Sequence, residues 1–201
     1  MVLCARALSL LFHPLMVGVW MALLVMYGYA SAMKFPHSIR EFVIGSMLAI
    51  TVAAPLLFRK LLSLSERLGR LRNSGRMFRC LTLVFDAICL VGCGWLFSAL
   101  PLLFLVRKML YLLTIATLVV LVVEFWRPLS RHLVAYGVVL GYMWVLLFVG
   151  NISLLYPFVV ALVGGGLLLS SRLYLTTQRP SVLYLSLIVG VLISLFGAFF
   201  V

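Results

Sequence analysis

The segment LVAYGVVLGYMWVLLFVGNISLLYPFVVALVGGGLLLSS, residues 133–171, decides the fold class of this chain. It contains 39 residues and no Asp, Glu, Lys or Arg. A helix that crosses a bilayer needs about 20 residues, so this segment is too long for a single crossing. Gly150-Asn151 divides it, which predicts two membrane-spanning helices near residues 133–149 and 154–171.

The rest of the chain has the same character. Of its 201 residues, 66% are hydrophobic and only 10% are charged, and the mean hydropathy is +1.27. A soluble domain has about 25% charged residues, so this chain has too little polar surface for a water-soluble globule. The sequence therefore predicts an all-α, polytopic transmembrane helical bundle of six to seven spans, in a single integral membrane domain over residues 1–201. The other expected spans lie near residues 8–33, 41–58, 80–97, 109–126 and 181–201.

The first apolar run has two interpretations. Arg6 precedes it and Ala30-Ser31-Ala32 lies near its end, an arrangement similar to a cleaved signal peptide. The apolar part of a signal peptide is only about 7–15 residues long, whereas this run extends from Leu8 to Met33. The length favours a first membrane helix, with a cleaved signal as the alternative.

The charges are strongly unbalanced, with sixteen Lys and Arg residues against four Asp and Glu. If seven spans alternate, twelve basic residues share one side: those of the N-terminus and of residues 59–79, 127–132 and 172–180. The positive-inside rule then favours the cytoplasm for this basic side. Because the charges lie between apolar runs, we expect membrane lipids as partners and no nucleic acid; the sequence specifies no protein partner.

Small residues and cysteines inside the spans favour packing roles. Gly137-x-x-x-Gly141 and the triplet Gly164–Gly166 permit close approach of neighbouring helices. The cysteines lack the spacing and the neighbouring ligands of a metal site, so we expect no metal and no cofactor; they are Cys4, Cys80, Cys89 and Cys93.

Several ionisable residues gather toward the basic side. Asp86 lies inside a predicted span, Glu124 and His132 lie at the ends of two others, and His13 lies near the start of the first. Ionisable residues within the membrane are candidates for function and usually have partners. The alternative for each carboxylate is an ion pair with an arginine that holds two helices together.

Two segments resemble motifs of a known family. EFWRPLSRH at residues 124–132 and SRLYLTTQRP at residues 171–180 each precede an apolar span. They resemble the second and third motifs of the type 2 phosphatidic acid phosphatase superfamily, which includes membrane lipid-phosphate phosphatases and soluble haloperoxidases. The resemblance covers roughly residues 55–200. It implies a bacterial inner-membrane protein that recognises a phosphorylated lipid headgroup.

The resemblance assigns roles residue by residue. Ser130-Arg131-His132 matches the Ser-Gly-His of the second motif, with Arg in place of Gly, and Ser171-Arg172 matches the start of the third. His132 then corresponds to the acid that protonates the leaving oxygen. The residues expected to bind phosphate are Ser130, Arg131, Ser171, Arg172 and Arg127.

The departures from the family concern the nucleophile. Gln178 occupies the position of the attacking His, and Val182 occupies that of the Asp that orients it. An amide nitrogen is neither basic nor nucleophilic, so no phosphohistidine can form at residue 178. The first motif, Lys, six residues and Arg-Pro, is also absent: Lys60/Arg67 and Arg72/Arg79 have the spacing without the Pro, and its register stays open.

Three functions follow as hypotheses. The first is binding of a lipid phosphate or polyprenyl phosphate with catalysis lost. The second is an active lipid-phosphate or polyprenyl-diphosphate phosphatase that uses His132 with an unusual nucleophile, for which His13 is a candidate. The third is a structural membrane subunit or a transporter. A simpler interpretation of the arginines is that they face lipid headgroups, and the family's catalytic side generally faces the periplasm, against the charge rule.

Overall fold

The computed structural model describes residues 14–28, 37–67, 75–100, 103–124, 129–148, 155–175 and 179–200. These residues form a bundle of helices, and no strand occurs among them. Six of the helices are long and apolar enough to cross a membrane. The predicted fold class, an all-α transmembrane bundle, is therefore confirmed.

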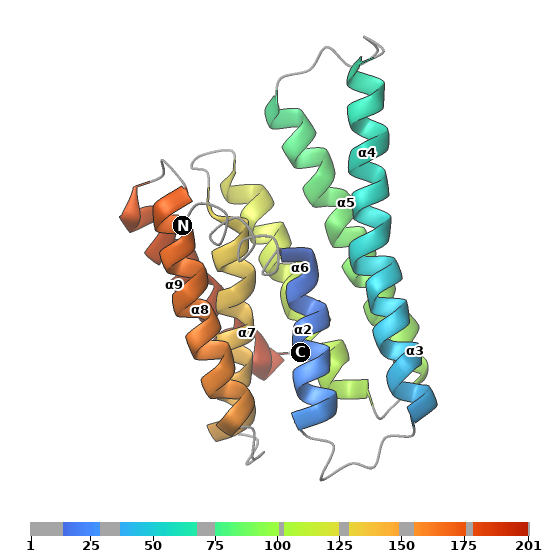
Figure 1. Ribbon diagram of the computed structural model, residues 1–201, viewed down its shortest axis with the longest axis vertical. Coiled ribbons are helices and arrows are strands. Elements are labelled where there is room, and N and C mark those ends of the chain that lie inside the picture. Colours follow the sequence, from blue (N-terminus) through green and yellow to red (C-terminus); the bar gives the residue numbers. More distant parts are fainter. Residues whose placement is uncertain are drawn as a thin grey trace.

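The helices run up and down through the bundle in chain order (Figure 1). Their bounds are α2 Pro14–Gly28, α3 His37–Met47, α4 Ala54–Arg67, α5 Gly75–Leu96, α6 Phe104–Val123, α7 Arg131–Phe148, α8 Leu155–Leu175 and α9 Pro180–Phe200. A π-helical stretch, Leu48–Ala53, joins α3 to α4, and a 3-10 turn, Phe97–Ala99, follows α5.

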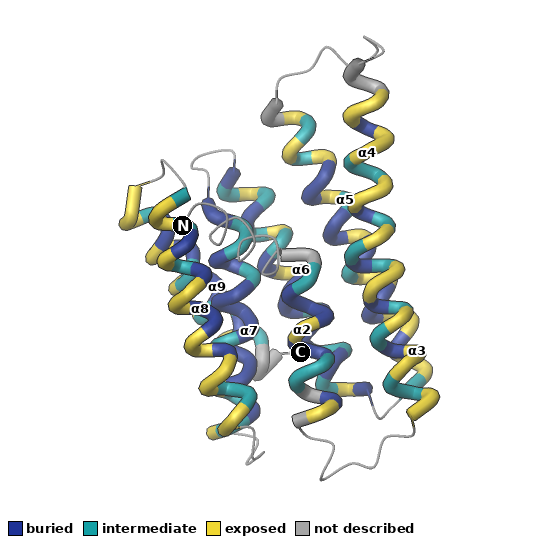
Figure 2. Tube along the Cα trace, viewed as in Figure 1, coloured by how far each residue is buried: buried dark blue, intermediate teal, exposed yellow. Residues whose placement is uncertain are grey.

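The first predicted span corresponds to α2, of which 15 residues are described. The ends of the predicted range, residues 8–13 and 29–33, lie outside the described residues. α2 lies inside the bundle, where Val17, Met21 and Met26 are almost completely buried. Figure 2 shows the dark, buried side of α2 against its neighbours.

The second helix differs from its predicted range of 41–58. α3, the π-helical stretch and α4 form one helix that continues past Arg59-Lys60 to Arg67. The part of this helix from His37 to Leu64 has 28 residues, which corresponds to about 42 Å, longer than the roughly 30 Å hydrocarbon core. Figure 1 shows α4 and α5 extending beyond α6–α9 at one end. Charged residues were therefore a poor signal for the end of this helix.

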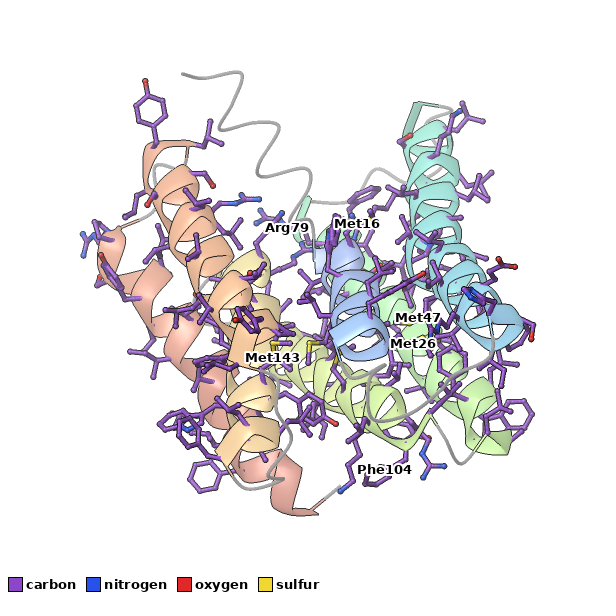
Figure 3. The ribbon with its side chains drawn as sticks, turned by 60° about the horizontal axis from the view of Figure 1, so that its bottom comes forward. Met16, Met26, Met47, Arg79, Phe104 and Met143 are labelled. Carbon is purple, nitrogen blue, oxygen red and sulfur yellow. The ribbon has the colours of Figure 1, made fainter. Side chains whose placement is uncertain are left out.

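The surface and the core both fit a lipid environment. Large apolar side chains point outward on the outer helices, among them Leu61, Trp95 and Phe196, which are 65%, 74% and 66% exposed. The interior is filled by large flexible or aromatic side chains, including Met21, Met47, Met109, Tyr142 and Met143. Figure 3 shows Met26, Met47 and Met143 in the middle of the bundle, between Arg79 and Phe104 at opposite ends.

α7 and α9 make the closest helix pair. A Cβ atom on Gly137 would collide with the backbone of Leu187, and one on Gly190 would collide with the backbone of Val134. The Ser194 hydroxyl donates a hydrogen bond of 2.6 Å to the Val138 carbonyl across the same interface. The small residues at 137 and 141 thus allow close helix approach, as the sequence predicts.

Candidate phosphate site at one end of the bundle

The residues expected to bind phosphate come from helix ends that lie at one end of the bundle. α7 begins at Arg131, α8 ends at Leu175 and α9 begins at Pro180, at the end from which α4 and α5 extend (Figure 1). Residues 130–132 and 171–172 therefore lie on the same side of the bundle. α7 also packs against both α8 and α9.

Ser130 lies directly before α7 and connects it to α9. The Ser130 carbonyl accepts hydrogen bonds from the backbone N–H groups of Leu133 and Val134, at 3.1 and 3.0 Å. The backbone N–H of Ser130 donates to the hydroxyl oxygen of Ser186 at 3.0 Å, and that hydroxyl donates to the Val182 carbonyl at 2.7 Å. This places the start of α7 against the helix that follows the third motif. Sequence reasoning missed Ser186, whose only signal is a polar residue within an apolar span.

Two ion pairs hold the neighbouring helices at this end. Arg59 of α4 pairs with Asp86 of α5 at 2.7 Å. Arg79 of α5 pairs with Glu124, the residue after α6, at 3.3 Å. Both carboxylates are buried, with side chains 10% and 6% exposed. For Asp86 and Glu124 the structure thus shows the alternative expected from the sequence, an ion pair with an arginine of another helix.

Arg131 belongs to the same charged cluster. Its half-buried side chain interacts electrostatically with Glu124 and Asp86. Together with Thr51 and Thr117, Arg131 and Asp86 line a small cavity of about 50 Å³. Within the described part of the chain, Oδ1 of Asp86 is buried without a hydrogen-bond partner. Arg59 and Arg79, the ion-pair partners of these carboxylates, act on Arg131 in the opposite sense, so Arg131 belongs to a cluster of three arginines and two carboxylates.

The end of α8 is different. Ser171 is buried and its hydroxyl donates to the Leu168 carbonyl at 2.8 Å, within its own helix. Arg172 is half-buried in the last turn of α8, and Arg179 is exposed just before α9. Neither α8 nor α9 contains an Asp or Glu. The arginines of these helices thus stand on a part of the bundle that carries no acidic residue.

His132 occupies the first turn of α7 and is half-buried. Val182, at the position of the family's Asp, is half-buried near the start of α9, where its carbonyl accepts the bond from Ser186. Arg127, Gln178 and His13 lie outside the described residues, so the arginine expected to bind phosphate and the nucleophile position have no structural description. For the first motif, Lys60 is exposed on α4 and Arg79 is paired with Glu124.

Among the described residues, no group of three or more His, Cys, Asp or Glu could hold a metal ion. Comparison of the chain with protein-family models, with curated proteins and with solved structures finds no match. The class of protein is therefore inferred from the helices, because their length and apolar composition suit a bilayer. The chain is an integral membrane protein built as an all-α transmembrane bundle.

Proposed function

We propose that this protein binds a membrane lipid that carries a phosphate group, at the end of the bundle formed by residues 130–132 and 171–179, without hydrolysing it. The supporting observation is the position of Arg172. It lies at the same end as Arg131, His132 and Arg179, on helices that contain no acidic residue. A planar guanidinium with several N–H donors suits the oxygens of a phosphate group.

Within this proposal the arginines have different roles. Arg131 lies in a cluster with Arg59, Arg79, Asp86 and Glu124, in which the two carboxylates form ion pairs with the other two arginines. Arg172 lies on α8 and Arg179 directly before α9, and neither helix contains an acidic residue, so we assign the main headgroup contacts to these two arginines. His132 lies one residue from Arg131 and supplies a further polar group. The family resemblance adds the inner membrane of a bacterium as the proposed location.

The absence of turnover is part of the proposal. Formation of a phosphohistidine requires an imidazole, and residue 178 is Gln. Val182 has no polar side-chain atom with which to orient a nucleophile. His132 alone can transfer a proton, but proton transfer without an attacking group gives little acceleration of phosphoester cleavage.

The test uses the full chain, purified in detergent, with phosphatidic acid and phosphatidylcholine of the same acyl chains. Native mass spectrometry is expected to show bound phosphatidic acid in excess over phosphatidylcholine. A phosphate-release assay on the same sample is expected to show no turnover above a heat-inactivated control. Equal binding of the two lipids would contradict the proposal, and phosphate release lost in His132→Ala would favour the active phosphatase instead.

The resemblance has its own test. Gln178→His combined with Val182→Asp supplies the family's missing nucleophile and its orienting carboxylate. Phosphate release from phosphatidic acid is expected to rise at least about tenfold above the unmodified protein, since the double change supplies the attacking imidazole that residue 178 lacks. The single change Val182→Asp is the matched control. A double variant that remains inactive at normal expression would contradict the assigned motif positions.

A further inference from the structure

A second cavity lies between α2, α7 and α8, deeper in the membrane than the arginines. Its volume is about 220 Å³. Its lining is apolar, and the side chains that form most of it are Val17, Met21, Leu24, Tyr136, Val139 and Val160. Trp20 also lines the cavity, and the Tyr136 hydroxyl donates to the Ala161 carbonyl at 2.8 Å.

The cavity lies in register with the residues proposed to bind the headgroup. On α7, His132, Tyr136 and Val139 are spaced i, i+4 and i+7, which places them on one face of the helix. On α8, Arg172 and Ala161 are eleven residues apart, about three turns, and also share a face. Tyr136 lies about 6 Å below His132 along the axis, and Ala161 about 16 Å below Arg172. Tyr136 and Ala161 at the cavity therefore share a helix face with His132 and Arg172, respectively.

The wall between α7 and α8 is well fixed. Gly165 brings the two helices so close that a Cβ atom there would lie 3.0 Å from Cε1 of Tyr136. The Tyr136 ring is held against Gly165 by this contact and by its hydrogen bond to Ala161. A ring fixed at both its edge and its hydroxyl presents a firm apolar surface to the cavity.

We infer that this cavity is a slot for one hydrocarbon chain of the phosphate-bearing lipid, whose headgroup is held at Arg172 and His132. The inference rests on the proposed function and adds where the tail lies. In a bilayer an apolar cavity open to the side is filled by hydrocarbon. The favourable free energy of filling the cavity comes from close van der Waals contact rather than from removal of apolar surface from water. A chain tethered by its phosphate at the arginine end is held in the slot, whereas a free lipid exchanges.

A second apolar groove in the same protein provides the control. It lies on α5 and α6, has a volume of about 490 Å³ and is lined by residues including Ile88, Val91, Gly92, Trp95 and Leu118. The helices that form it end at the Arg79–Glu124 pair, where the carboxylate already balances the arginine. We expect this larger groove to take any lipid chain, without preference for a phosphate headgroup.

The experiment places the full chain in phosphatidylcholine vesicles that contain a small fraction of a photoreactive lipid, with a diazirine in the middle of one acyl chain. One probe is phosphatidic acid and the other is phosphatidylcholine. After illumination, labelled peptides are identified by mass spectrometry. Peptides of α2, α7 and α8 around the slot are expected to carry about fivefold or more label from the phosphatidic acid probe, whereas the α5–α6 groove labels equally with both.

Two variants sharpen the result. Val160 is 61% exposed, so Val160→Phe fills the slot at low risk to the fold and should abolish the preference for phosphatidic acid there. Gly92→Phe is the matched change in the control groove, where no atom lies within 4 Å of an added Cβ, and should leave the slot labelling unchanged.

The outcomes separate the two proposals. Suppose that Arg172→Ala reduces phosphatidic acid binding but that the slot, like the control groove, labels equally with the two probes. This result would overturn the slot and leave the headgroup site intact. Slot labelling that is the same for both probes, in a protein whose phosphatidic acid binding does not change in Arg172→Ala, would overturn the proposed function and the slot's phosphate selectivity together. Preference for phosphatidic acid in the slot, lost in both Arg172→Ala and Val160→Phe, supports the inference.

Discussion

The two halves of this bundle are held together by different kinds of contact. α4, α5 and α6 are joined at one end by the ion pairs Arg59–Asp86 and Arg79–Glu124. α7 and α9 are joined by glycine contacts and by the hydrogen bonds of Ser186 and Ser194. Both kinds of contact suit a membrane, where burial of apolar side chains provides little driving force for helix association.

The difference also separates two classes of arginine. In the ion-paired half, each arginine that forms a described salt bridge is balanced by a buried carboxylate. In the other half, Arg172 lies on α8 and Arg179 directly before α9, and neither helix contains an acidic residue. Arg59 and Arg79 of the first class hold helices together through these ion pairs, and we propose that Arg172 and Arg179 of the second class contact an anionic headgroup. The comparison therefore predicts which substitutions alter stability and which alter lipid binding.

The largest effect on stability is expected in the glycine-packed half. Gly137→Leu places a side chain where the backbone of α9 already lies, and backbone atoms cannot move aside as a flexible side chain can. We expect a loss of at least about 3 kcal/mol, at the upper end of the range for overpacking. Thermal unfolding in detergent, followed by circular dichroism, measures it. Gly166→Leu, with no atom within 4 Å of an added Cβ, is the control and should change little.

A smaller loss is expected when the buried ion pair is broken. Asp86→Ala leaves Arg59, a quarter exposed, without its carboxylate. Removal of one partner of a fully buried pair costs 3–5 kcal/mol, and partial exposure reduces the expected loss to about 2–3 kcal/mol. Replacing both residues, as Arg59→Leu with Asp86→Leu, should recover most of the loss. A double variant as unstable as the single one would show that Asp86 acts through other contacts.

The smallest effect is expected for the more exposed pair. The Arg79 side chain is 54% exposed, and the pair is longer, at 3.3 Å. Exposed ion pairs contribute about 0–1 kcal/mol, so Arg79→Ala should lower stability by less than about 1 kcal/mol in the same unfolding assay. A loss equal to that of Asp86→Ala would mean that exposure does not distinguish the two pairs.

Much of the fold could be predicted from the sequence, because charge-free runs of membrane length need no knowledge of tertiary contacts. The helix that contains the predicted span 41–58 continues past Phe58 to Arg67, and Arg59 on it pairs with Asp86, 27 residues later. In a run that is apolar on every side, the sequence does not indicate which face of the helix is buried. The pairing of α7 with α9 and the role of Ser186 were therefore not predictable.

For the candidate site, the sequence predicted a set of residue types at helix ends. It did not predict that Arg131 would interact with Asp86 and Glu124, since that depends on how α5, α6 and α7 pack. It also did not indicate that the Ser171 hydroxyl is used by its own helix. The assignment of Arg172 to the headgroup therefore combines a sequence hypothesis with the absence of acidic residues on α8 and α9.

The central claim is that the arginines of the two halves have different roles, and one comparison tests it directly. Arg172→Ala and Arg79→Ala each remove one positive charge from the same end of the bundle, and phosphatidic acid binding is measured for both by native mass spectrometry. We predict about a tenfold loss for Arg172→Ala, since hydrogen bonds to a charged group contribute about 1.5–3 kcal/mol, and no more than about a twofold change for Arg79→Ala. Equal losses in the two variants would contradict the account, because binding would then follow total charge rather than a site on α8.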